Sequence, residues 1–314
     1  MKEIVSFREK VLENVGKVII GKEKEVELLL IAFLSEGHIL LEDLPGMGKT
    51  VMVRSFAKTL DLPFKRIQFT PDLLPGDLTG VSFYNQKTKE FEFREGPLFS
   101  NMILADEINR ATPRTQAALL EAMEERQITV DGVTRKLKEP FMVLATQNPV
   151  ESYGTFPLPE AQMDRFLMRI KMGYPTLEEE KIILRETLGK VLETLSALFD
   201  HDLLMQRRED VKKVTVSDEV LTYLLSIVRA TRESEDITLG VSPRGSIGLY
   251  RAAQARAALS GRAYMLPEDV KAMAPYTLNH RMISDDVVGV VESMEKIEKI
   301  LEEIPVPLEN LEEN

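Results

Sequence analysis

Several residue types and patterns are missing from this chain of 314 residues. It has no cysteine, which excludes disulfides, thiolate zinc sites, iron–sulfur clusters and a cysteine nucleophile. It also lacks an excess of positive charge, because 40 Lys and Arg stand against 51 Asp and Glu and give a formal net charge of −11. This balance, with no basic tail and no aromatic-basic patch, argues against binding to DNA or RNA. We expect no nucleic-acid partner.

No hydrophobic run is long enough to cross a membrane. The most apolar stretch, residues 26–34, contains Glu27 and is far shorter than the roughly 20 residues that a spanning helix needs. The start of the chain intersperses charges and has no apolar core followed by a small-residue cleavage site, so it is not a secretory signal. We therefore expect a cytoplasmic protein without a membrane span.

The first half of the chain has the pattern of an α/β domain. Residues 1–36 predict two helices with a break at Gly21, and short apolar runs then alternate with helical stretches from His38 to Gly173. This alternation predicts a parallel sheet with crossover helices. Two hairpins interrupt it, one turning at residues 85–88 and one at Asp131-Gly132, a favoured pair for tight turns.

The strand pattern ends after residue 174. Helical patterns follow at residues 176–190, 217–233, 243–261 and 267–275. We therefore expect two domains: an α/β core at residues 1–174 with the two hairpins as inserts, and a smaller all-α domain at residues 175–314.

The sequence "LEDLPGMGKT" at residues 41–50 is typical of a phosphate-binding loop between a strand and a helix. Its glycines let backbone amides approach phosphate oxygens, Lys49 supplies a cation, and Thr50 offers a hydroxyl to Mg²⁺. Asp43 stands where the strict pattern has its first glycine, and we predict that its carboxylate points away from the phosphates and braces the loop. The alternative is an ordinary glycine-rich turn. The residues expected to bind the nucleotide are Gly21, Pro45, Gly46, Met47, Gly48, Lys49, Thr50 and Val51.

Asp106 and Glu107 follow an apolar strand and are expected at the same sheet edge as the loop. Asp106 would hold Mg²⁺ through water, and Glu107 would polarise the water that attacks the γ-phosphate. Taken alone, such a pair is more often the solvated start of a helix. The loop upstream favours the nucleotide site.

Three further polar residues are placed where they could reach a γ-phosphate. Asn148 ends a third strand and can hydrogen-bond the attacking water, although it could equally form a turn before Pro149. Arg165 precedes the last strand, where it could reach the site of a neighbouring subunit. Arg244 projects from a helix start at Pro243. Arg165 could instead form a surface ion pair, and Arg244 could be a solvated arginine on a surface turn.

The ordered motifs resemble those of AAA+ ATPases and, more narrowly, the MoxR family. The stretches that carry the resemblance are "ADEINRATPRTQAALLEAMEERQITVDG", "ATQNPVESYGTFPLPEAQMDRFLM", "SPRGSIGLYRAAQARAALSGRAYMLPEDV" and "ILEEIPVP". The resemblance implies a P-loop αβα core with a parallel sheet, a smaller all-α lid, ATP between them, and a ring that is commonly a hexamer.

The resemblance also implies roles for individual residues. Asn148 would be sensor 1, Arg165 the arginine finger acting in trans, and Arg244 sensor 2, which couples the lid to the γ-phosphate. Gln68 matches the position of a polar switch residue near the catalytic glutamate. The two hairpins match the helix-2 insert and the pre-sensor-1 hairpin, which in related rings face the pore or the client.

Three functions follow from this interpretation. The leading one is a Mg²⁺-dependent ATPase whose cycle of ATP and ADP drives chaperone-like remodelling, maturation or metal-cofactor loading of a partner complex, as MoxR-type proteins are proposed to do with von Willebrand A-domain partners. The alternative is a slow nucleotide-dependent switch or scaffold for such a partner. A DNA-associated motor comes third, because the net charge argues against it.

Overall fold

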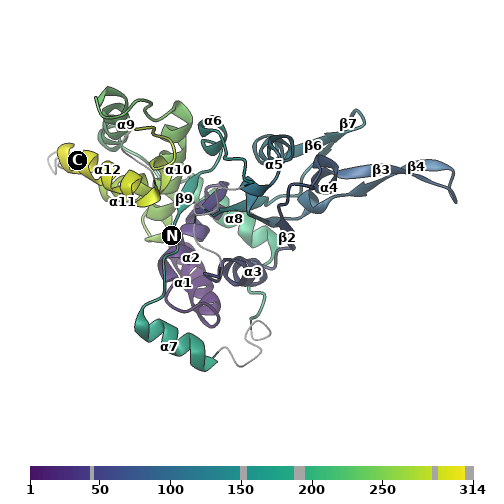
Figure 1. Ribbon diagram of the computed structural model, residues 1–314. Helices are drawn as coiled ribbons and strands as arrows, with labels where there is room; N and C mark the ends of the chain where they lie inside the picture. Colours follow the sequence, from purple (N-terminus) through teal and green to yellow (C-terminus); the bar gives the residue numbers. More distant parts are fainter. Residues whose placement is uncertain (43–45, 149–153, 187–194, 285–288, 308–314) are drawn as a thin grey trace.

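A five-stranded parallel sheet forms the centre of the first half of the chain (Figure 1). The computed structural model describes residues 1–42, 46–148, 154–186, 195–284 and 289–307. In spatial order the strands are β2 (Phe64–Gln68), β5 (Met102–Asp106), β8 (Met142–Gln147), β1 (Ile39–Glu42) and β9 (Met168–Ile170). The predicted α/β core with a parallel sheet is confirmed.

Both faces of the sheet are covered at its three central strands, which explains why β5, β8 and β1 are apolar and buried over most of their length, whereas the edge strand β2 carries Lys65 and Arg66. Neighbouring side chains on a strand point to opposite faces. In β1, Ile39 and Leu41 therefore join one hydrophobic cluster and Leu40 joins the other. The first cluster is formed with α1 (Lys2–Gly16), α2 (Glu23–Leu34) and α3 (Lys49–Thr59), and the second with α5 (Pro113–Glu125).

Both predicted hairpins are present and extend from the same end of the molecule (Figure 1). β3 (Gly80–Asn85) pairs with β4 (Glu90–Glu95), and β6 (Gln127–Val130) pairs with β7 (Val133–Lys136). Asp131 and Gly132 have φ angles of 52° and 75°, as a tight hairpin turn requires. The short elements around these hairpins are α4 (Pro75–Thr79), η1 (Pro97–Phe99), η2 (Ile108–Arg110) and α6 (Glu160–Met163).

The rest of the described chain is helical, as predicted. Its helices are α7 (Leu177–Glu186), α8 (His201–Lys212), α9 (Asp218–Glu233), α10 (Pro243–Leu259), α11 (Pro267–Leu278) and α12 (Val290–Glu303). The helices predicted at residues 217–233 and 243–261 are present as α9 and α10, and the hydroxyls of their N-caps, Ser217 and Ser242, accept hydrogen bonds from Val220 N and Gly245 N. The sequence did not predict α8 or α12 as separate helices. None of the described helices is long and apolar enough to span a membrane.

The helical part shares its hydrophobic core with α1 and α2. α10 packs on α2, and α11 packs on β9. α8 also lies against the core, because Arg207 pairs with Glu3 over 2.6 Å. The division of the chain at residue 174 stays a prediction.

His38 and His280 are buried. The Nδ1 atom of His38 accepts a hydrogen bond from Val143 N over 3.0 Å, and Nε2 donates to Met123 O over 3.1 Å, so the ring is neutral. Burial, with a smaller contribution from the charge of Arg126, lowers the pKa of His38 to about 3. The unfolded chain takes up a proton near pH 6.5, whereas the folded chain does not.

Stability is therefore expected to fall as the pH drops below 6.5. Between pH 7 and pH 5, His38 alone should lower the free energy of unfolding by about 2 kcal/mol, because the proton binds only the unfolded state. Urea unfolding at several pH values measures this slope, which His38→Gln should flatten. His201→Gln, at an exposed position, should leave it unchanged. A slope that is identical in His38→Gln and the wild type would contradict the assignment.

Candidate functional site

The glycine-rich loop connects β1 to α3 at the carboxyl edge of the sheet. Gly46 and Gly48 have φ angles of 85° and 80°, in the region that favours glycine, and a Cβ on either would meet no atom within 4 Å. Their backbone therefore faces open space. Gly48 is the N-cap of α3, and as a glycine it has no side chain to cap this helix end. Asp43 and Pro45 lie outside the described residues.

The remaining loop residues begin α3. Lys49 and Thr50 stand in its first turn, partly exposed, beside Met47. The apolar side chain of Val51 is 38% exposed. A helix N-terminus with a lysine in its first turn has the electrostatics of an anion site.

Gly21 lies against the segment that enters the helical part. Its φ angle is 67°, and a Cβ there would meet the Glu179 carboxylate at 2.0 Å. The adjacent Lys22 is buried and donates from Nζ to the carbonyl oxygens of Met172 and Gly173 over 2.6 and 3.2 Å. Residues 21–22 therefore contact the chain between β9 and α7, and a nucleotide contact of Gly21 stays a prediction.

Asp106 and Glu107 lie at the same edge as the loop, because β5 runs parallel to β1 and β8. Thr146, on β8, orients both residues: its hydroxyl donates to Asp106 Oδ1 over 2.6 Å and accepts from Glu107 N over 2.8 Å. Glu107 has a φ of 58°, a strained conformation for a residue other than glycine. Asn148 follows the end of β8 and is 8% exposed.

Each of these carboxylates already has partners from β2 or η2. Arg66 donates from Nη2 and Nε to Asp106 Oδ2 over 2.6 and 3.0 Å. Gln68 donates from Nε2 to Glu107 Oε2 over 2.6 Å, and Arg110 pairs with the same oxygen over 3.1 Å. Gln68 thus lies where the sequence analysis expected a residue near Glu107. Arg66 and Arg110 were missed, although Arg66 shares a strand face with Gln68 at spacing two.

Arg165 and Arg244 lie at the opposite edge of the sheet. Arg165 precedes β9, and the N–H of Leu167, just before β9, donates to the carbonyl oxygen of His38, just before β1, over 2.8 Å. Arg165 Nε pairs with Glu124 Oε2 over 2.9 Å, and Arg244 pairs with the other oxygen of the same carboxylate. A strand rises about 3.3 Å per residue, so the two edges are separated by roughly 15 Å. The structure therefore does not bring Arg244 to Lys49 of its own chain.

A cationic cavity of about 310 Å³ opens beside this pair of arginines. Its charged lining residues are Arg126, Arg165, Arg244, Arg251, Arg281, Glu36, Glu124 and Asp164. The five guanidinium groups outnumber the three carboxylates, so the cavity favours an anion.

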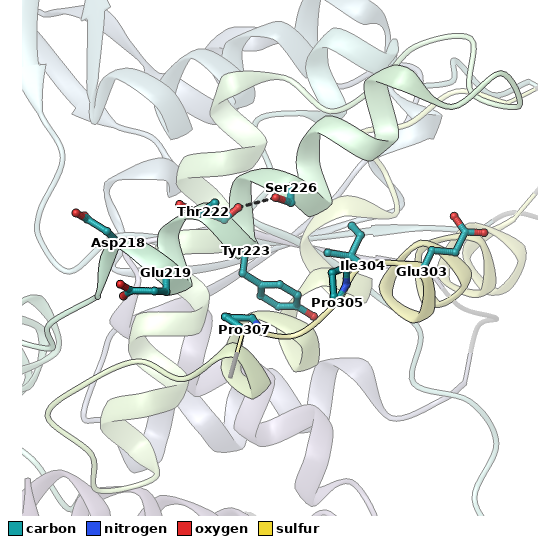
Figure 2. Close-up of a pocket in the computed structure, with 9 residues that line it drawn as sticks. All are labelled: Asp218, Glu219, Thr222, Tyr223, Ser226, Glu303, Ile304, Pro305 and Pro307. Atoms are coloured by element: carbon teal, nitrogen blue, oxygen red, sulfur yellow. Dashed lines mark hydrogen bonds between the residues drawn. The ribbon is translucent and has the colours of Figure 1, made fainter. Parts of the chain in front are cut away.

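A second cavity, of about 550 Å³, lies between α9 and residues 304–307 (Figure 2). Its acidic residues are Asp218, Glu219 and Glu303, and none of the predicted nucleotide-binding residues lines it. An acidic, partly apolar lining does not fit a nucleotide phosphate.

The residues at the carboxyl edge fit a nucleotide with Mg²⁺. The open glycine backbone and the glycine N-cap of α3 suit phosphate oxygens. Asp106, at the same edge of the sheet as Thr50, could hold a cation, and the described residues contain no cluster of three or more His, Asp or Glu side chains for a metal. Mg²⁺ usually needs only one or two protein ligands beside phosphate and water. A cation and Arg66 would compete for Asp106 Oδ2.

Comparisons with known proteins place this fold and site in a class. The family "ATPase family associated with various cellular activities (AAA)" matches residues 38–168, and the "AAA lid domain" matches residues 229–304. The chain thus has the nucleotide-binding core and the helical lid of an AAA+ protein.

Relatives over nearly the full length narrow this class. Chaperone MoxR1 of Mycobacterium tuberculosis is 38% identical over 96% of this chain and 83% of its own length, and the uncharacterized protein YeaC of Bacillus subtilis is 52% identical over 87% and 86%. A solved structure from Cytophaga hutchinsonii, described as a candidate ATPase, has a TM-score of 0.89 and 42% identity over 98% of both chains. The chain belongs to the MoxR family of AAA+ ATPases.

Proposed function

We propose that this protein hydrolyses ATP with Mg²⁺ and uses the cycle to remodel a partner protein complex. The observation that carries the proposal is the arrangement at the carboxyl edge of the sheet. The start of α3, with Gly48 as its N-cap, and the Asp106–Glu107 pair lie at this edge, where β1 and β5 neighbour each other through β8. This combination supplies the two requirements of phosphoryl transfer, a phosphate cradle and a carboxylate base.

The roles of the residues follow from their chemistry. Lys49 and the loop amides bind the β- and γ-phosphates, while Thr50 and Asp106 hold the cation, which neutralises charge on the phosphate oxygens when it is bound. Glu107 accepts a proton from the attacking water once Gln68 and Arg110 release its carboxylate. Asn148 orients that water.

Arg165 and Arg244 act on the nucleotide of a neighbouring subunit. They lie at the opposite edge of the sheet from Lys49 and Asp106, so one chain cannot bring both sets to one phosphate. A head-to-tail contact, repeated around a closed ring, would place the arginines of each subunit at the carboxyl edge of the next. A hexamer is the ring we propose.

The partner is a protein, and a von Willebrand A-domain protein is the candidate we propose. Support comes from the relative named Chaperone MoxR1 and from the β3–β4 hairpin, where Phe83, Tyr84 and Phe91 are 44%, 52% and 77% exposed. Exposed aromatic side chains at a projecting tip are suited to contact another protein. A cytoplasmic location stays a prediction.

The enzymatic part is tested by phosphate release from the purified protein over a range of protein concentrations, with and without Mg²⁺. The specific rate should rise with protein concentration as rings assemble, and it should vanish in EDTA. Absence of hydrolysis at every concentration, with and without a candidate partner, would contradict the proposal.

The remodelling part is tested by the affinity for a von Willebrand A-domain partner in ADP and in a nonhydrolysable ATP analogue. A remodeller should hydrolyse ATP faster when the partner is present. A nucleotide switch would also bind the partner with different affinities in ADP and in the ATP analogue, but the partner would not increase the rate of ATP hydrolysis. That outcome would contradict remodelling and favour the switch.

Lys49→Ala is expected to abolish detectable ATP binding, because it removes the one cationic side chain among the described loop residues 46–50. Asp43→Gly should bind ATP as the wild type does if the carboxylate braces the loop. A fluorescent ATP analogue measures both affinities. Tighter binding by Asp43→Gly would instead mean that the carboxylate repels the phosphates.

A further inference from the structure

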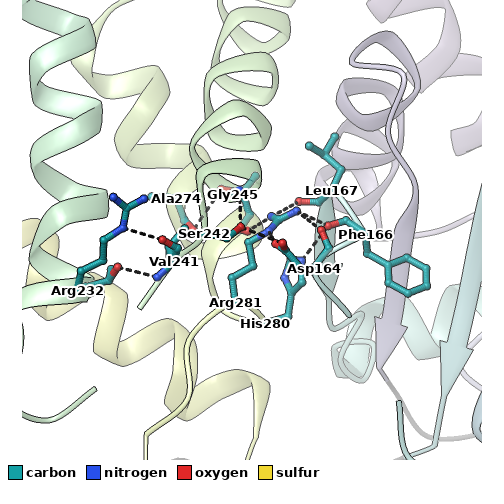
Figure 3. Close-up of polar contacts among 12 residues, drawn as sticks. Asp164, Phe166, Leu167, Arg232, Val241, Ser242, Gly245, Ala274, His280 and Arg281 are labelled. Carbon is teal, nitrogen blue, oxygen red and sulfur yellow. Dashed lines mark hydrogen bonds and ion pairs between the residues drawn. The ribbon is translucent and has the colours of Figure 1, made fainter. Parts of the chain in front are cut away.

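Arg281 follows α11 and is buried against the segment that carries Arg165. Its side chain is 2% exposed. Nε donates to Asp164 Oδ1 over 2.7 Å, and Nη2 donates to the carbonyl oxygens of Asp164 and Phe166 over 3.1 and 2.6 Å. Nη1 donates to Leu167 O over 3.1 Å and to Thr277 O. All five guanidinium N–H groups are therefore used, and four of them hold residues 164–167 (Figure 3).

The other side of Arg281 contacts the start of α10, which carries Arg244. Ser242, the N-cap of α10, donates from its hydroxyl to Asp164 Oδ2 over 2.8 Å, so the carboxylate joins Ser242 to Arg281. A Cβ at Gly245 would lie 2.8 Å from Arg281 Cδ, and one at Gly248 would lie 3.5 Å from Nη1. The first turns of α10 therefore rest directly on the Arg281 side chain (Figure 3).

The guanidinium groups of Arg165 and Arg244 are also connected to each other. Arg165 and Arg244 each pair with one oxygen of Glu124. Their backbones are tied through Arg281 and Asp164, and their guanidinium groups are tied through Glu124. These connections hold Arg165 and Arg244 in a fixed position relative to each other.

We propose that Arg281 is a positioning residue for the neighbouring subunit's nucleotide site. It locks the segment of Arg165 to the start of α10, so that Arg165 and Arg244 are presented together across the subunit boundary. This inference rests on the proposed function, because it requires Arg165 to act in trans. Lysine cannot replace Arg281. Its ammonium group has three N–H groups, whereas the planar guanidinium group of Arg281 donates four hydrogen bonds to residues 164–167 at once.

The test is a mixing experiment between two inactive chains. Lys49→Ala lacks a nucleotide but keeps its arginines, and Arg165→Ala holds a nucleotide but has no finger. Neither chain should hydrolyse ATP alone. In an equal mixture, the only complete sites combine the nucleotide of an Arg165→Ala chain with the finger of a Lys49→Ala neighbour, and about a quarter of the interfaces in the rings have this composition.

Arg281→Lys is then added to one chain at a time. In the Lys49→Ala chain, which donates the finger, it should lower the recovered hydrolysis by about tenfold or more, since finger placement controls the rate. In the Arg165→Ala chain, which only holds the nucleotide, it should leave the recovered hydrolysis unchanged within error. Binding of a fluorescent ATP analogue to Arg281→Lys should also match the wild type.

Two controls separate positioning from a general loss of structure. Arg256→Lys perturbs another ion pair of α10, with the buried Asp269, and should not reproduce the asymmetry between the two mixtures. If Arg281→Lys fails to fold, Ser242→Ala takes its place, because it removes the bond to Asp164 together with the N-cap bond from Gly245 N and leaves the Arg281 side chain in place.

Equal losses in the two mixtures would overturn the inference and make Arg281 a structural residue. A larger loss in the nucleotide-holding chain would also overturn it, since Arg281 would then act on its own site. A third outcome is that the wild type hydrolyses ATP, but the mixture of Lys49→Ala and Arg165→Ala chains without Arg281→Lys does not. This outcome would contradict the proposed sharing of a site between subunits, and the inference about Arg281 would be overturned with it.

Discussion

Glu107→Gln is expected to lower kcat for ATP hydrolysis by about 10²–10⁴-fold while ATP still binds. The amide that replaces the carboxylate cannot take a proton from water, but it has nearly the same shape. The phosphate contacts of Lys49 and the loop do not involve this side chain. ATP should therefore accumulate on the variant, which becomes a trap for the ATP state.

The measurement is phosphate release at saturating ATP, together with the affinity for a fluorescent ATP analogue. Glu121→Gln, at an exposed position on α5, is the matched control and should hydrolyse ATP at the wild-type rate. Hydrolysis by Glu107→Gln at a rate equal to the wild type would show that another group is the base.

Arg165→Ala is expected to lower kcat by about 10³–10⁵-fold, because an arginine finger stabilises charge that develops on the transferred phosphoryl group. Nucleotide affinity should hardly change, since Arg165 lies at the amino edge of its own sheet. The variant also frees one oxygen of Glu124, which leaves Arg244 as the remaining partner of that carboxylate.

Arg114→Ala removes an exposed arginine of α5 and serves as the control. Single-turnover hydrolysis and binding of the ATP analogue are compared for the two variants. An Arg165→Ala protein that loses ATP affinity as strongly as rate would place this arginine at its own nucleotide and contradict action in trans.

Much of the fold could be predicted from the sequence because its signals are local. The central strands β5, β8 and β1 are largely apolar runs, and Asp131-Gly132 favours a tight turn. The helix starts at Ser217 and Ser242 follow from side chains that cap the first turn. The meeting of the loop with Asp106 and Glu107 also follows from the parallel topology alone.

Helix α8 was not predicted because it lacks an apolar stripe. Its buried face includes two arginines, Arg207 and Arg208, together with Leu204 and Val211. Arg207 is paired with Glu3 and Asp210. Burial of a charge depends on partners that are distant in sequence, and hydrophobic periodicity does not report them. In α12, by contrast, Ile297 and Leu301 recur at helical spacing, so the pattern was available.

The partners of the site residues could not be predicted for the same reason. Glu124 meets Arg244 across 120 positions of sequence, and Arg281 meets Asp164 across 117. Each side chain alone is typical of a solvated surface residue. Only the packing of the helical part on β9 and α2 brings them together.

We propose that each nucleotide site is completed by two subunits, and a mixture of two inactive chains tests this directly. Phosphate release is followed while Lys49→Ala and Arg165→Ala chains, each inactive alone, are mixed in equal amounts. We expect recovery of up to about a quarter of the wild-type rate, because Arg165 of a Lys49→Ala subunit reaches the nucleotide of its Arg165→Ala neighbour. A mixture that remains as inactive as its components, while the wild type hydrolyses ATP, would contradict a site completed by two subunits.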